Sequence, residues 1–331
     1  MLVVDAHLDL SYNALRGRNV LAPASEQTPD EEGIPTVGLP DLREGGVGLI
    51  CATIFCMPEY DKFKGYRTAA EAREVALREL DWYRRQEDSG RMRFVRTSAD
   101  LDTDSSTSQA AILLMEGADP LLSPDDLADW FAAGLRIVGL AWRQTRYAGG
   151  TKMPGPLTPA GREMVQALDR HRIIHDLSHL AEESFWQLLD ISGGPVIASH
   201  SNCRSIVPTD RQLSDEMIRA IGKRNGVIGI NFFDKFLLPP AEQGHRRATL
   251  GDVVAHIRHM CDLIGDARHV GIGTDMDGGL GRNEIPEEIQ TSADLPRIAD
   301  ALSHDGFNDS DVRAILGGNW IEFFRKNLPD K

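Results

Sequence analysis

Eight short apolar segments, spaced along almost the whole chain, limit most strongly how this sequence can fold. Each is rich in Val, Ile and Leu and nearly free of charge, as are strands that are buried on both faces of a parallel sheet. They occupy residues 2–7, 47–55, 110–117, 135–142, 172–179, 195–200, 226–233 and 269–275. The chain is therefore predicted to form a sheet of eight buried parallel strands.

Helical patterns of the right length for crossover connections alternate with these segments. They cover residues 69–86, 125–134, 157–171, 181–191, 213–224, 249–265, 293–303 and 309–326. Such alternation is typical of an α/β protein with a (β/α)8 TIM-type barrel, although alternation alone also allows a doubly wound open sheet. No repeat or linker divides the 331 residues, so we expect a single barrel domain over residues 1–331 with a loop excursion at about residues 16–40.

Charge and cysteine content narrow the classes of partner. The chain has 50 acidic and 36 basic residues, a net charge of −14, which disfavours binding to nucleic acid. No segment approaches the roughly 20 apolar residues of a membrane span, and the first residues lack a basic leader, so neither a membrane partner nor a secretory signal is expected. The four cysteines show no CxxC spacing, and we expect buried thiols and a cytoplasmic location. The sequence leaves open whether the protein forms a homo-oligomer.

Imidazole and carboxylate side chains stand where five of the eight segments end. They are His7, Asp9, Glu116, His179, His200 and Asp275. Because all strand ends of a barrel point to one face, these six side chains should converge there. Imidazoles and carboxylates are the ligands of Zn²⁺ and similar divalent ions, and burying so many charged groups without a cation would be costly. The sequence therefore predicts a metal site.

Three other patterns give weaker signals. His175 and His179 are four residues apart, but the segment reads as a strand, so His175 is interpreted as a core or surface residue or, alternatively, as a residue that supports the metal ligands from behind. His256 and His259 fall on an amphipathic helix and are expected to be solvated. The DMDGG segment at 275–279 is like the start of a calcium loop, but the rest of that pattern is missing.

Six segments carry a resemblance to a known family. They are DAHLDL at 5–10, MEG at 115–117, LTPAGREMVQALDRHRIIHDLSHL at 157–180, PVIASHSNCRSI at 195–206, HVGIGTDMDG at 269–278 and GGNWIEFFR at 317–325. In order and approximate spacing the chain resembles the membrane (renal) dipeptidase family of zinc peptidases, within the amidohydrolase superfamily.

The resemblance implies a barrel that holds two metal ions sharing one carboxylate. His7 and Asp9 would bind one ion, His179 and His200 the other, and Glu116 would bridge them. The ions are expected to be Zn²⁺, although another divalent metal suits the same ligands.

The resemblance also implies a reaction, the hydrolysis of the amide bond of dipeptides, including L,D-dipeptides. A metal-bridging hydroxide would attack the scissile carbonyl. Asp275 matches the catalytic aspartate, which would take the proton of the nucleophile and deliver it to the departing amine. Glu116 belongs to the catalytic set as the bridging carboxylate. Arg211 matches the arginine that holds the terminal carboxylate of the substrate, which favours very short peptides.

The chain departs from the family pattern at the end of the fourth segment. Trp142 stands where the family has a histidine that contacts the substrate, and Arg143 follows it. Both are candidate substrate-binding residues, and Arg146 is a further source of positive charge. The alternative interpretations are a plain aromatic at the barrel mouth for Trp142 and surface ion pairs for the two arginines.

Two further functions stay open beside the dipeptidase. The first keeps the metal ions but acts on N-acyl amino acids or other small amides. The second is a barrel without catalysis that only binds a ligand, which the retention of every metal-ligand type and of Asp275 disfavours.

Overall fold

All eight predicted strands are present in the computed structural model, which describes residues 2–61, 63–102 and 108–330. They are β1 (Val3–Leu8), β2 (Val47–Phe55), β4 (Gln109–Glu116), β5 (Leu135–Gly139), β6 (Ile174–Asp176), β7 (Val196–Ile197), β8 (Ile228–Ile230) and β9 (Val270–Ile272). A short strand that the sequence did not predict, β3 (Met92–Phe94), pairs with β4 in parallel.

The strand order in the sheet identifies the fold. The order is β7-β6-β5-β4-β2-β1-β9-β8, with β3 beside β4. It follows the chain, and the first strand lies next to the last one, β9, with Asp5 opposite Ile272. A doubly wound sheet instead reverses its order at a switch point. The (β/α)8 barrel is confirmed, and the open-sheet alternative is wrong.

The predicted crossover helices are also present. They are α3 (Ala69–Asp88), α4 (Leu127–Ala132), α5 (Pro159–Arg170), α6 (Glu182–Ile191), α7 (Asp215–Lys223), α9 (Leu250–Ile264), α10 (Arg297–His304), α11 (Asp309–Arg313) and α12 (Asn319–Asn327). Thr68, Thr158 and Ser214 cap α3, α5 and α7 by accepting a hydrogen bond from a backbone N–H of the first turn. These caps explain why the three helices begin where they do.

Short elements fill the connections. They are the α-helices α1 (Leu10–Leu15), α2 (Leu39–Glu44) and α8 (Asp234–Leu237), the 3₁₀ turns η1 (Ala24–Glu26), η2 (Ser98–Asp102), η3 (Pro124–Asp126), η4 (Arg282–Glu284) and η5 (Ser292–Asp294), and the π-helical turn η6 (Ala314–Gly318).

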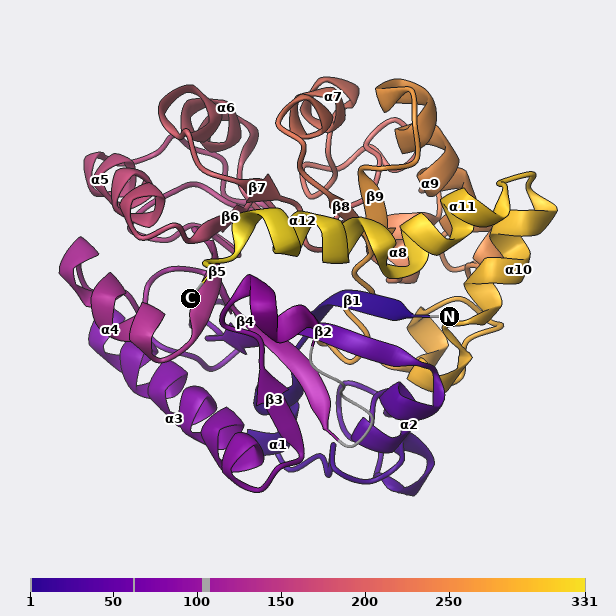
Figure 1. The fold of residues 1–331 in the computed structure, drawn as a ribbon, viewed down its shortest axis with the longest axis horizontal. Helices are drawn as coiled ribbons and strands as arrows, with labels where there is room; N and C mark the ends of the chain where they lie inside the picture. Colours follow the sequence, from indigo (N-terminus) through magenta and orange to yellow (C-terminus); the bar gives the residue numbers. More distant parts are fainter. Residues whose placement is uncertain (1, 62, 103–107, 331) are drawn as a thin grey trace. The chain divides into compact units, whose positions relative to one another are not determined.

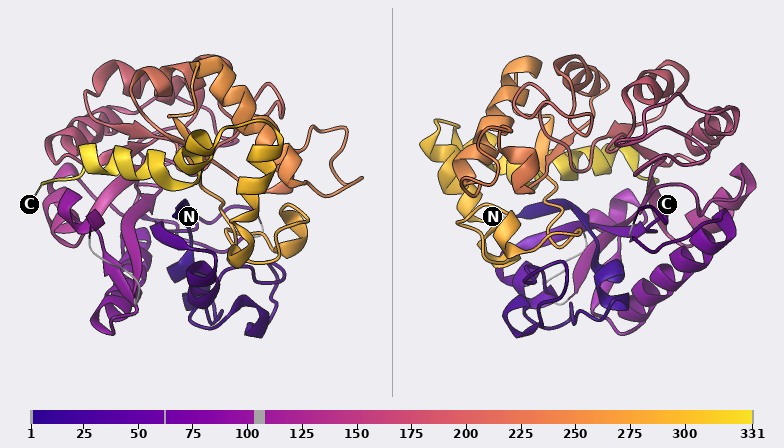
Figure 2. Two further views of the ribbon diagram at one scale, coloured as in Figure 1. Left: turned by 45° about the vertical axis from the view of Figure 1, so that its right-hand side comes forward. Right: turned by 180° about the vertical axis from the view of Figure 1, so that it is seen from behind.

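The described chain divides into two compact units. The first comprises Met1–Cys51 and Ala198–Phe324, and the second Ala52–Ile197 and Arg325–Lys331. Within the first unit α9 lies between α7 and α10, as Figure 1 shows. Within the second unit α5 and α6 lie side by side, and α3 is the long helix of the right-hand view of Figure 2. The single-domain expectation stays a prediction.

The loop excursion at residues 16–40 is fixed to the DMDGG segment of the first unit. Thr36 donates to Asp277 from its backbone N–H and from its hydroxyl, at 2.9 and 2.7 Å. The guanidinium of Arg18 lies 3.2 Å from the same carboxylate and also pairs with Asp30. The second aspartate of the segment therefore anchors the excursion.

All four cysteines are buried, as predicted, and the described part of the chain contains no disulfide. Among the described residues, no helix combines the length and the apolar character that a bilayer crossing requires.

The expectation of a solvated His256 is wrong. The ring is fully buried. The backbone N–H of Cys203 donates to Nδ1 at 3.1 Å, and Nε2 lies 3.1 Å from the carbonyl oxygen of Leu237. This pairing assigns the proton to Nε2 and satisfies both nitrogens of the neutral ring. Burial lowers the pKa of His256 from 6.5 to about 4.

We expect His256 to make the stability of the protein sensitive to acid. The folded-state pKa, about 4, lies below the unfolded value of 6.5, so the unfolded chain binds the extra proton first. The contribution is complete above about pH 6.5 and is lost as pH falls towards 4, by about 2 kcal/mol between pH 7 and pH 5. Thermal unfolding at the two pH values should show a smaller pH-dependent drop for His256→Gln than for the wild type. The exposed His304, changed in the same way, serves as control, and a His256→Gln variant with the full wild-type drop would contradict the assignment.

Candidate active site

The ends of β1 and β9 bring three predicted site residues together in the first unit. One ligand atom each from His7, Asp9 and Asp275 lies within 4.8 Å of the others. Nε2 of His7 is 3.9 Å from Oδ2 of Asp9, and both side chains are buried. One imidazole and two carboxylates are a donor set that suits a divalent cation.

Asp5 aligns the two strand ends that carry these residues. Its buried carboxylate accepts hydrogen bonds from the backbone N–H and the hydroxyl of Thr274, at 2.8 and 2.6 Å. Burial raises the pKa of Asp5 to about 6. The backbone N–H of Asp275 donates to the carbonyl of His7 at 3.3 Å. Asp275 is thereby held against β1 by its own backbone N–H and by the hydrogen bonds of the preceding residue, Thr274.

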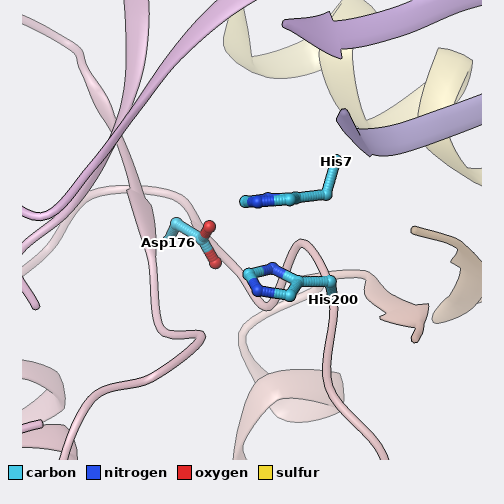
Figure 3. Close-up of side chains that lie close together, drawn as sticks. All are labelled: His7, Asp176 and His200. Carbon is cyan, nitrogen blue, oxygen red and sulfur yellow. The ribbon is translucent and has the colours of Figure 1, made fainter. Parts of the chain in front are cut away.

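His200, which follows β7, lies against His7. The two ring centroids are 3.6 Å apart at an interplanar angle of 31°, and Figure 3 shows the rings facing each other. The Ser199 hydroxyl oxygen lies 3.1 Å from Nδ1 of His7 and 2.7 Å from Nδ1 of His200. A hydrogen-bond partner at one ring nitrogen orients the other nitrogen, as it does in metal-binding histidines.

Asp275 has an unusual backbone and a tightly packed carboxylate. Its φ angle of 60° lies in the left-handed region, which non-glycine residues seldom adopt and which is found preferentially at functional sites. The side-chain amide of Asn231 donates to Oδ2 at 2.9 Å. A Cβ at Gly278 would lie 2.1 Å from Oδ1 of Asp275 and 2.9 Å from Oδ2 of Asp9, so only glycine fits beside the two carboxylates.

Arg211 is buried beside His200. Its guanidinium donates to the Ser201 hydroxyl at 3.0 Å and to the carbonyl oxygen of His200 at 2.5 Å, and it lies over the ring of Phe236. The structure therefore places this cation in the same unit as His7, next to the backbone of a predicted metal ligand.

The second unit brings Glu116 and His179 together. Glu116 ends β4 and is buried, and its Oε1 lies 3.1 Å from Nε2 of His179. The Thr151 hydroxyl lies 3.0 Å from the other ring nitrogen, Nδ1, and orients the ring. His179, like Asp275, has a left-handed backbone, with φ of 64°.

Asp176 is a buried carboxylate that the sequence analysis did not single out. It ends β6, three residues before His179, and its Oδ1 accepts a hydrogen bond from the backbone N–H of Ser178 at 3.0 Å (labelled in Figure 3). The available signal was an acidic residue within a segment predicted to be a buried strand.

Trp142 lies beside His179, whereas the two arginines that follow it differ in their surroundings. The ring centroids of Trp142 and His179 are 6.1 Å apart. Arg143 lies over the ring of Tyr60. Arg146 donates to the carbonyl oxygens of Asp119 and Leu121, at 2.8 and 2.7 Å, and its Nε is 3.7 Å from the Asp119 carboxylate. For Arg146 the ion-pair interpretation is therefore confirmed.

A (β/α)8 barrel that pairs buried imidazoles and carboxylates at its strand ends has the donor set of a metal-dependent enzyme. Comparison with known families agrees. The family model described as membrane dipeptidase, peptidase family M19, matches residues 1–328, and the chain belongs to this family. The resemblance inferred from the sequence is confirmed.

Curated relatives share about a third of their aligned residues with the chain. An uncharacterized Klebsiella pneumoniae protein, from the 5′ region of pqqA, is 30% identical over 250 residues, which cover 72% of this chain and 89% of the relative. Dipeptidase tcpJ of Claviceps purpurea is 32% identical over 58% of this chain and 45% of its own length. An uncharacterized dipeptidase of Schizosaccharomyces pombe is 29% identical over 61% of this chain and 49% of its own length. The chain thus spans about half the length of the two fungal relatives.

Solved structures of the same family have the same fold over their whole length. A metallo peptidase called dipeptidase AC is 27% identical, with a TM-score of 0.84 and 99% of both chains covered. A metallo peptidase from Rhodobacter sphaeroides, liganded with a phosphinate mimic of the dipeptide L-Ala-D-Ala, is 26% identical, with the same TM-score and coverage.

Proposed function

We propose that this protein is a dinuclear metal-dependent dipeptidase. His7 and Asp9 hold one divalent ion, His179 and His200 hold the second, and Glu116 binds both. The ions are Zn²⁺ in this proposal, because imidazole and carboxylate ligands suit it, although manganese or iron can use the same donors.

The observation that carries the proposal is the paired orientation of imidazoles and carboxylates at the strand ends. His7 presents Nε2 to Asp9 at 3.9 Å, and His179 presents Nε2 to Glu116 at 3.1 Å. In both histidines a hydroxyl oxygen, from Ser199 or Thr151, contacts the opposite nitrogen. Histidine ligands of metal ions are oriented in this way, and family membership over residues 1–328 makes dipeptide hydrolysis the matching reaction.

The metal ions and the side chains of the protein have separate roles in this reaction. Bound divalent ions would lower the pKa of a water and polarise the scissile carbonyl. Asp275 accepts the proton of the nucleophile on Oδ1, since Asn231 holds Oδ2, and passes it to the departing amine. Arg211, itself positioned by Ser201, pairs with the terminal carboxylate of the substrate and limits the site to very short peptides.

Hydrolysis of a peptide panel tests the proposal. Purified protein, stripped by a chelator and then loaded with Zn²⁺ or Mn²⁺, is assayed with L,L- and L,D-dipeptides beside N-acyl amino acids. The D-residue is included because the Rhodobacter sphaeroides relative binds a mimic of L-Ala-D-Ala. We expect metal-dependent hydrolysis of dipeptides, with about two ions per chain by elemental analysis.

Two outcomes would contradict the proposal in different ways. Activity on N-acyl amino acids alone would replace the substrate class and keep the metal centre. Fewer than one ion per chain together with no hydrolysis would favour the non-catalytic binding barrel. A cytoplasmic location and self-association stay predictions.

A further inference from the structure

A cluster of two aromatic rings and one arginine lies beside His179 in the second unit. Tyr60, Trp142 and Arg143 form this aromatic–arginine cluster. The Trp142 ring is 5.6 Å from the Tyr60 ring and 6.1 Å from the His179 ring, centroid to centroid. The guanidinium carbon of Arg143 lies 4.4 Å from the centroid of the Tyr60 ring. All three side chains are half-buried, so they are accessible from solvent.

The polar atoms of the cluster are donors that the described part of the chain leaves unused. Among residues 2–61, 63–102 and 108–330, the Arg143 guanidinium, the Trp142 indole N–H and the Tyr60 hydroxyl make no hydrogen bond or ion pair. Arg67, close in sequence to Tyr60, does find a carboxylate, that of Glu59 at 2.8 Å. An arginine without such a partner is notable in a chain with 50 acidic and 36 basic residues.

The geometry of the cluster suits a carboxylate ligand. A guanidinium stacked on an aromatic ring keeps its N–H groups in the plane of the guanidinium, where they can bind both oxygens of one carboxylate. The ring also removes water from one face of the cation, which strengthens its interaction with an anion. The indole N–H and the phenol hydroxyl add two further donors.

We propose that the aromatic–arginine cluster binds a side-chain carboxylate of the substrate, so that the preferred dipeptides contain Glu or Asp. The inference rests on the proposed dipeptidase function and narrows its substrate class. The terminal carboxylate is the other anion that a dipeptide offers. Since every dipeptide carries it, only a preference for the acidic side chain identifies the ligand as the one we propose.

Matched acid and amide peptides test the inference on the metal-loaded enzyme. The pairs are Ala-Glu with Ala-Gln and Asp-Ala with Asn-Ala, in whichever stereochemistry is hydrolysed. We expect kcat/KM to favour the acidic member about 10- to 100-fold in at least one pair, the range for a hydrogen-bonded charge pair. In Arg143→Gln this ratio should fall towards one, mainly through KM, and Arg143→Lys should keep part of it. Arg67→Gln is the matched control and should keep the wild-type ratio.

The outcomes separate this inference from the proposed function. Equal kcat/KM for acid and amide in both pairs, with dipeptides still hydrolysed, would overturn the inference alone. So would a preference that survives unchanged in Arg143→Gln. A protein that hydrolyses no dipeptide would end the proposed function and this inference together.

Discussion

Replacing Glu116 by alanine is expected to abolish both full metal occupancy and turnover. In the proposed centre its carboxylate is the only ligand that both ions share, and it also faces Nε2 of His179 at 3.1 Å. Its loss would remove one ligand from each ion and leave an uncompensated cation in a buried site. We expect elemental analysis to find one ion per chain or fewer, and kcat/KM to fall by about 1,000-fold or more, which is about 4 kcal/mol of transition-state stabilisation.

The control for Glu116→Ala is an exposed glutamate of the same unit. Glu163 lies on α5 with its side chain in solvent, and Glu163→Gln should keep both metal content and activity. Circular dichroism of each variant checks that the barrel remains folded. A Glu116→Ala protein that binds two ions per chain with unchanged affinity would contradict the bridging role, whatever its activity.

The sequence predicts the strands of the barrel well, whereas the choice between a barrel and an open sheet required the strand order. Strands buried on both faces appear as continuous apolar segments, and all eight are present. The pattern did not reveal β3, because Arg93 stands at its centre between Arg91 and Arg96, and no continuous apolar segment marks the strand. Such elements form because the surrounding structure holds them, as β4 holds β3.

Candidate ligands were predictable from the sequence, whereas the residues that orient them were not. A histidine or carboxylate at the end of an apolar segment is conspicuous, as His7 and Glu116 are. Ser199, Thr151 and Asn231 are of types that occur in every loop, and only the folded chain brings them to His7, His179 and Asp275. Asp277 shows the same limit, because its partners lie some 240 residues away in sequence.

His256 was misplaced for a related reason. Helical periodicity assigns polar residues to the solvent face, which holds for an average helix. Here Cys203 and Leu237 supply a donor and an acceptor, so the neutral ring can be buried at little cost. Sequence alone does not show that such partners exist on other segments.

Replacing Asp275 by asparagine is expected to remove the acid–base step while the metal centre remains. The change preserves the shape of the side chain, and its amide oxygen can still accept the hydrogen bond from Asn231. The amide nitrogen would then occupy the place of Oδ1, where it cannot take a proton from the nucleophile. General acid–base catalysis contributes about 100- to 10,000-fold, so we expect kcat to fall within that range with two ions still bound. Asp300→Asn, an exposed change on α10, should retain wild-type rates.

Metal content decides between two roles for Asp275, because its carboxylate also lies within 4.8 Å of ligand atoms of His7 and Asp9. If the residue moves protons, Asp275→Asn keeps the ions, and the acidic side of the pH profile of kcat/KM changes, because the carboxylate that must be deprotonated there has been removed. If the residue is instead a ligand, the ion held by His7 and Asp9 is bound more weakly, and added metal restores part of the rate. If added metal restores the rate in this way, Asp275 is a metal ligand and not the residue that moves protons.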